Sequence, residues 1–205
     1  MKVPFFSGLA LAALCVSAIS PLAAQAIDQS NSGLGCCFGG ATAWQGQTFR
    51  PTATTSAGGG FSFYSRAPTT GTIKIALWDR LASDAGAVML ASGSAGYSTG
   101  AGLANLEVFW TAVAVTPGQQ YFLAVYAGDD NLVTAQSGNT YADGQAYYNY
   151  STDPTAGYSC CGGGYDLGFV EYASSVVATP EPASVALLAT GLLGIAGVVR
   201  RKRNA

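Results

Sequence analysis

The chain has 205 residues, of which 49% are hydrophobic and only 10% are charged. It contains no histidine, which excludes Ser-His-Asp and Cys-His catalysis and removes the commonest metal ligand. Between residues 27 and 179, four basic and ten acidic residues give a formal charge of −6. Because nucleic acid phosphates repel such a domain, no nucleic-acid partner is expected.

The N-terminus has the pattern of a signal peptide. Lys2 supplies a positive charge, an apolar stretch follows over residues 3 to about 19, and Ala24-Gln25-Ala26 offers a small-x-small cleavage site. This order predicts a signal peptide over residues 1–26 and a mature chain that begins near Ile27. An uncleaved N-terminal anchor is the alternative.

Residues 27–179 are long enough for one domain with a sizeable core. Short strands are expected at 47–50, 61–64, 72–78, 88–91, 107–115, 120–126, 145–150 and 167–172. The clearest alternation puts Ile73, Ile75 and Leu77 on one face. Turn signals lie at 57–60, 68–71, 116–118 and 143–144. The spacing predicts an all-β fold, namely a β-sandwich of jelly-roll type.

Four cysteines remain outside the signal peptide, in two adjacent pairs. They are Cys36, Cys37, Cys160 and Cys161. An exported chain meets an oxidising compartment, so disulfides are expected, and four cysteines allow three connectivities. A bond between neighbours would close a strained ring, which favours Cys36 with Cys161 and Cys37 with Cys160. A four-cysteine zinc site is the alternative, although structural zinc ligands are usually spaced C-x₂₋₄-C.

Carboxylates are the remaining candidates for acid–base chemistry. A glycosidase needs two of them about 5–10 Å apart. Asp79, Glu107 and Asp166 are available, but surface or turn positions are the favoured interpretation of all three. We therefore expect a domain that is not an enzyme, with a carboxylate-based hydrolase as a distant alternative.

Calcium is a second candidate ligand. Asp129 and Asp130, followed by Asn131, and Asp143, followed by Gly144, offer oxygen atoms in loops, which calcium accepts. Neither segment has EF-hand spacing, and turn formation explains both. No cofactor is expected, and calcium at these aspartates is the alternative.

Tyrosines are the third candidate for ligand binding. Tyr148 and Tyr150 share one strand face, and Tyr147 lies on the other. The first two could present an aromatic platform to sugar rings. Packing of one face into the core is the favoured interpretation.

The C-terminal segment has three parts in a fixed order. Pro180, Glu181 and Pro182 precede an apolar run of 17 residues at 183–199. Four basic residues then follow, namely Arg200, Arg201, Lys202 and Arg203. The pattern predicts a transmembrane helix with its basic end on the cytoplasmic side of the inner membrane.

This order, and the wording TPEPASVALLATGLLGIAGVVRRKR, closely resemble the PEP-CTERM sorting signal of Gram-negative bacteria. The resemblance implies that an exosortase, a membrane-embedded processing enzyme, recognises and cuts the segment 180–205. Pro180 and Pro182 disfavour helix and leave an extended segment that a protease can bind. A plain membrane anchor is the alternative.

The middle of the chain also resembles a jelly-roll domain found in exported bacterial proteins with sorting tails. The motifs that carry the resemblance are GQTF at 46–49, LWD at 77–79, TPGQQYFLAVY at 116–126, YADGQAYY at 141–148 and DLGFVEY at 166–172. The resemblance implies a fold rather than catalytic residues. The paired cysteines depart from this pattern.

The expected protein is thus exported and non-enzymatic. It would pass through the inner membrane and then reside in the cell envelope or the extracellular matrix, with a structural or adhesive role. Its expected partners are an exosortase and extracellular polysaccharide. The alternative function is a carbohydrate-binding module acting on exopolysaccharide.

Overall fold

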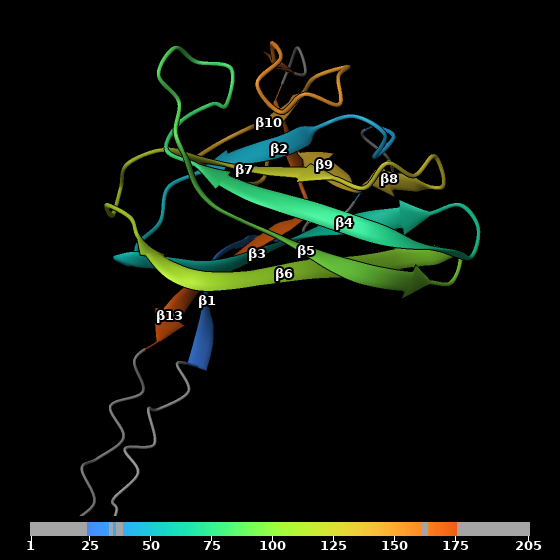
Figure 1. Ribbon diagram of the computed structural model, residues 1–205, viewed down its shortest axis with the longest axis horizontal. Coiled ribbons are helices and arrows are strands. Elements are labelled where there is room, and N and C mark those ends of the chain that lie inside the picture. The colour runs from blue at the N-terminus through green and yellow to red at the C-terminus, as the bar shows by residue number, and fades with distance from the viewer. Residues whose placement is uncertain (1–23, 33–34, 36–38, 161–163, 176–205) are drawn as a thin grey trace, which may run out of the picture. The chain divides into compact units, whose positions relative to one another are not determined.

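Every regular element that the computed structural model describes is a β-strand (Figure 1). The structure describes residues 24–32, 35, 39–160 and 164–175. Their strands are antiparallel wherever they pair, and two larger sheets pack face to face with apolar side chains between them. The predicted all-β sandwich is therefore confirmed. Only residues 24–26 of the predicted signal peptide are described, as the start of the first strand, and the predicted transmembrane helix lies outside the described residues.

The first sheet contains both ends of the domain. Its strand order is β1 (Ala24–Asn31), β13 (Phe169–Ser175), β3 (Thr55–Ser65) and β6 (Gly102–Ala114), with β8 (Leu132–Thr134) also paired to β3. Ala24 pairs with Ser175, so the first and last described residues lie side by side (Figure 1). Cleavage after Ala26 would remove three paired residues from β1 and leave Ile27–Asn31 on the sheet.

The second sheet carries the candidate site. Its order is β11 (Ser159–Cys160), β10 (Ala146–Tyr148), β2 (Gln45–Phe49), β7 (Tyr121–Tyr126), β4 (Thr69–Trp78) and β5 (Met89–Thr99). A separate pair joins β12 (Tyr165–Leu167) to β9 (Gln136–Gly138). Each expected strand overlaps an observed strand, and the one expected at 167–172 covers the end of β12 and the start of β13. Strands β1, β8, β9 and β11 were not expected.

The core between the sheets follows the predicted alternation of β4. Ile73, Ile75 and Leu77 are at most 1% exposed and pack in one cluster with Leu123 of β7. Part of the outer face of the same sheet is also covered. Trp44, Trp78 and Phe122 belong to a second buried cluster under the loops that follow β4 and β10, which is why β7 is apolar along its whole length.

The predicted turn at 57–60 is wrong, because these residues lie inside β3. Glycines there are required by close packing on both faces of the strand rather than by a turn. A Cβ atom on Gly58 would lie 2.5 Å from Phe109 Cδ1, and one on Gly60 would lie 2.7 Å from Glu107 Cγ. One on Gly59 would lie 2.9 Å from both methyl groups of Leu123. The turn predicted at 68–71 is placed too far along the chain, because Thr69 is already the first residue of β4.

Replacing Gly59 by alanine should therefore destabilise the domain by about 1–3 kcal/mol, the usual cost of overpacking a core. Leu123 is fully buried and cannot move aside without displacing its neighbours. Chemical denaturation of the purified protein measures the change. Gly157→Ala is the control, because a Cβ atom at that position would have no atom of the described structure within 4 Å. Equal stability of the two variants would contradict this packing.

Candidate functional site

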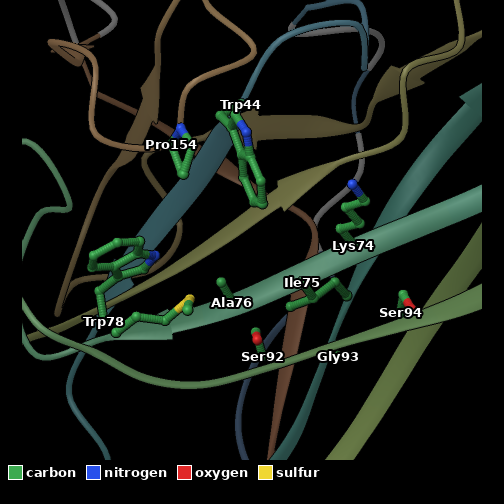
Figure 2. A pocket seen from close by; sticks show the side chains of 10 residues that line it. Trp44, Lys74, Ile75, Ala76, Trp78, Ser92, Gly93, Ser94 and Pro154 are labelled. Carbon is green, nitrogen blue, oxygen red and sulfur yellow. The ribbon is translucent and has the colours of Figure 1, made fainter.

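A groove of about 350 Å³ opens on the outer face of the second sheet (Figure 2). We call it the tryptophan groove. Its lining side chains are those of Trp44, Lys74, Ala76, Trp78, Met89, Ser92, Ser94 and Pro154. The groove therefore combines two indole rings, one ammonium group and two hydroxyl groups.

Strand alternation places the residues along one side of the groove. Lys74, Ala76 and Trp78 alternate with the buried Ile75 and Leu77 and so face outward from β4. At about 3.3 Å per residue, the Cα atoms of Lys74 and Trp78 are roughly 13 Å apart. The small side chain of Ala76 between them leaves the floor of the groove open. The sequence signal for the groove is this large–small–large order on one face.

Strand β5 supplies the opposite side in register. Ser94 pairs with Lys74, Ser92 pairs with Ala76, and Met89 pairs with Trp78. The side chains of Ser92 and Ser94 are exposed, and Met89 is 50% exposed. The polar groups thus gather beside Lys74, while the apolar groups gather beside Trp78.

Trp44 is held rigidly above the sheet. Its Nε1 donates a hydrogen bond of 3.0 Å to the backbone oxygen of Thr152, and its ring stacks on Tyr126 with centroids 5.6 Å apart. Thr152 lies in the loop that follows β10, and this loop also brings Pro154 to the edge of the groove (Figure 2). Asp153 stabilises this loop by accepting hydrogen bonds from the backbone nitrogen and the hydroxyl of Thr155, and these bonds lower the pKa of Asp153.

Two donors in the groove have no acceptor among the described residues. Lys74 is exposed and forms no ion pair or hydrogen bond within this part of the chain. Trp78 is 7% exposed, and its buried Nε1 has no hydrogen-bond partner there. In Figure 2 this nitrogen lies on the side of the indole that faces the other labelled residues. Leaving a buried donor such as Trp78 Nε1 unpaired costs about 1–3 kcal/mol.

The tyrosines singled out by the sequence lie outside this groove. Tyr148 and Tyr150 contact each other edge to face, with centroids 4.9 Å apart, and Tyr150 is 88% exposed. They line a different depression together with Gly40 and Gln45. Tyr147 points the other way and packs edge to face against Phe122, as the alternation predicts.

The aspartates proposed as calcium ligands do not gather into one cluster. Asp129 accepts hydrogen bonds from the hydroxyls of Thr69 and Tyr97, at 2.7 and 2.8 Å, and from the backbone nitrogen of Asn131. Burial would raise the pKa of Asp129, but these hydrogen bonds outweigh it and lower the pKa. Burial, aided by Asp129, raises the pKa of Tyr97 to about 12.

Asp143 lies elsewhere, in a depression lined by Arg50 and Gln145. No group of three or more His, Cys, Asp or Glu side chains within the described residues is placed to hold a metal ion.

The three carboxylates considered for hydrolysis are also separate. Asp79 pairs with Arg80 at 2.9 Å, and Glu107 accepts a 2.9 Å hydrogen bond from the hydroxyl of Tyr172 on the first sheet. Asp166 is fully buried and accepts a hydrogen bond from Gln47. Within the described part of the chain, these three carboxylates share no hydrogen-bond partner.

The cysteine prediction lies largely outside the described residues. Cys36, Cys37 and Cys161 are not described, and Cys160 is described only as the second residue of β11. The disulfides and their connectivity stay a prediction.

Comparison with known families identifies the C-terminal segment. Residues 178–203 match the family model of the PEP-CTERM protein-sorting motif. The match contains Pro180, Glu181 and Pro182 as well as the basic cluster at 200–203, and it confirms the sorting-signal resemblance. No curated protein matches the chain. Within the described residues, no helix has the length and apolar character needed to cross a membrane.

Proposed function

We propose that this chain is a non-enzymatic structural or adhesive protein of the cell envelope or extracellular matrix of a Gram-negative bacterium. The sorting motif at residues 178–203 carries the proposal, because that motif marks extracellular proteins sorted by an exosortase. The unprocessed chain resides in the inner membrane, and processing then releases the β-sandwich to its final location.

The chemistry of the domain agrees with a non-enzymatic role. Histidine is absent from the sequence, and Asp79, Glu107 and Asp166 are engaged in three different sets of contacts. Polysaccharide hydrolysis that disappears in Asp79→Asn or Glu107→Gln would overturn this part of the proposal.

A carbohydrate-binding module is the second candidate function. The tryptophan groove favours it, because two indole rings line the groove, and neither Lys74 Nζ nor Trp78 Nε1 has an acceptor among the described residues. The proposed partner is then extracellular polysaccharide.

The sorting role predicts a defined product of processing. In cells with an active exosortase, intact-mass measurement of the mature protein should give a C-terminus near Pro182. A variant with alanine at Pro180, Glu181 and Pro182 should keep the full tail and accumulate in the inner-membrane fraction, since the extended recognition segment is lost.

The control for this experiment is Pro68→Ala, a proline of the sandwich itself, which should be processed as the natural chain is. An intact Arg203-Asn204-Ala205 end on the natural chain in those cells would reject the sorting role.

A further inference from the structure

We propose that the tryptophan groove binds an uncharged polysaccharide, with Trp78 Nε1 and Lys74 Nζ donating hydrogen bonds to its hydroxyl or ring oxygen atoms. The site differs from the tyrosine pair and the loop aspartates that the sequence suggested. It deepens the second candidate function and rests on export, which brings the groove into contact with extracellular polysaccharide.

The unpaired indole nitrogen is the first observation that points to a ligand. Buried N–H groups nearly always have an acceptor, but Trp78 Nε1 has none among the described residues. Met89 pairs with Trp78 across the strands and is half exposed. Because Nε1 is buried, a neighbouring side chain must move before a ligand oxygen atom can reach it, and the flexible Met89 is the half-exposed neighbour on β5.

The second observation is the division of the groove into an apolar part and a polar part. Trp44, Trp78 and Met89 offer apolar surface to the C–H groups of a sugar ring, while Lys74, Ser92 and Ser94 offer hydrogen bonds to its oxygen atoms. A sugar has both kinds of surface on one ring. A purely aliphatic ligand would leave Lys74 and both serines desolvated and unpaired.

Charge favours an uncharged chain over an acidic one. The domain carries six more negative than positive charges between residues 27 and 179. Lys74 is the only cation among the described residues that line the groove, so a polyanion would gain one ion pair there against long-range repulsion from the whole domain. We therefore assign Lys74 to hydrogen bonding rather than to charge pairing.

Affinity electrophoresis of the exported protein, purified from cells that make it, tests the proposal. The probes are three neutral polysaccharides, hydroxyethylcellulose, dextran and galactomannan, and the acidic polysaccharide alginate. We expect retardation by at least one neutral probe and none by alginate. Trp78→Phe keeps an aromatic ring but loses the N–H donor, and the loss of one hydrogen bond should weaken binding about tenfold. Lys74→Met should weaken it by a similar factor.

Trp110→Phe is the matched control. Trp110 also has a buried Nε1 without a partner in the described part of the chain, but it lies on β6 and packs against the core between the sheets. The substitution should leave binding unchanged. Tyr150→Ala should also have no effect, which separates the groove from the tyrosine pair. Circular dichroism of each variant establishes that it is folded.

Four outcomes would overturn the proposal. They are no retardation by any neutral probe, binding that persists in the Trp78→Phe, Lys74→Met double variant, binding lost only in Tyr150→Ala, and retardation by alginate alone. Sorting is read separately from the mass of the C-terminus, so failure of the groove and failure of the sorting role are distinguishable.

Discussion

Replacing Glu171 by glutamine should remove a pH dependence of stability between about pH 4.5 and 7. Glu171 lies in β13, is 0% exposed, and neither of its carboxyl oxygens has a hydrogen-bond partner of good geometry in the described structure. A carboxylate in such a site is strongly disfavoured relative to the neutral acid.

Burial raises the pKa of Glu171 from 4.5 to about 7. The nearby Ser56 hydroxyl acts in the opposite direction by a smaller amount, and the charge of Asp28 adds to the increase. The difference between the two pKa values corresponds to about 3 kcal/mol, at about 1.4 kcal/mol per pKa unit.

The folded and unfolded states hold the proton of Glu171 with different affinities, and this difference sets the direction of the pH dependence. Between pH 4.5 and 7 the folded protein keeps the proton on Glu171 and the unfolded chain has lost it, so the folded state binds more protons. The free energy of unfolding therefore falls as the pH rises through this window. The contribution is fully present below pH 4.5, is lost by about pH 7, and does not change further at higher pH.

Urea denaturation of the natural protein and of Glu171→Gln from pH 4 to 8 measures the effect. The free energy of unfolding of the natural protein should fall by about 3 kcal/mol more than that of the variant across this range. Glu171→Met gives the same comparison without a buried amide. Glu107→Gln is the control, because Glu107 is exposed and its loss should leave the pH dependence intact. Parallel curves for the natural protein and Glu171→Gln would show that Glu171 titrates normally.

Local sequence patterns predicted the parts of the fold that depend on local chemistry. The alternation of Ile73, Ile75 and Leu77 marked the inner face of β4, and the proline–glycine turn at 117–118 was correct. The sorting motif was equally accessible, because its three parts are contiguous in the sequence.

The sequence-based predictions were wrong or incomplete where a partner distant in the sequence determines the local structure. The side chains of Phe109 and Glu107 lie against Gly58 and Gly60 on the outer face of β3. They come from residues about fifty positions further along the chain. Strand β1 is polar for much of its length and exists because β13 pairs with it. No local pattern contains either partner.

The candidate site also depends on residues that are far apart in the sequence. Lys74 and Trp78 lie on one strand, but the groove also needs Ser92 and Ser94 from β5 and Pro154 from a remote loop. Only the register of the strands and the packing of that loop bring these groups together. The sequence pointed instead to Tyr148 and Tyr150, because they share one face of an expected strand, but they line a different depression.

Asp166→Ala should destabilise the domain by about 3–4 kcal/mol, because Asp166 joins two separate segments at one buried point. It is 0% exposed and accepts hydrogen bonds from Gln47 Nε2 at 2.8 Å and from the backbone nitrogen of Tyr141 at 2.7 Å. Gln47 Oε1 in turn accepts a 2.9 Å hydrogen bond from the backbone nitrogen of Leu167. The alanine variant leaves two donors unpaired, the buried Gln47 Nε2 and the part-buried backbone nitrogen of Tyr141, and each such loss costs about 1–3 kcal/mol.

A double-mutant cycle with Gln47→Met separates this network from a general loss of packing. If Asp166 and Gln47 act through their hydrogen bond, the double variant should be more stable than the sum of the single effects predicts, by about 1–2 kcal/mol. Asp84→Ala is the control; Asp84 is exposed, so its removal should change stability by less than about 0.5 kcal/mol. Urea denaturation of all four proteins provides the values. Additive effects, or a loss below about 1 kcal/mol in Asp166→Ala, would contradict the network, whereas strong coupling would make Asp166 a structural residue that fixes β12 against β2.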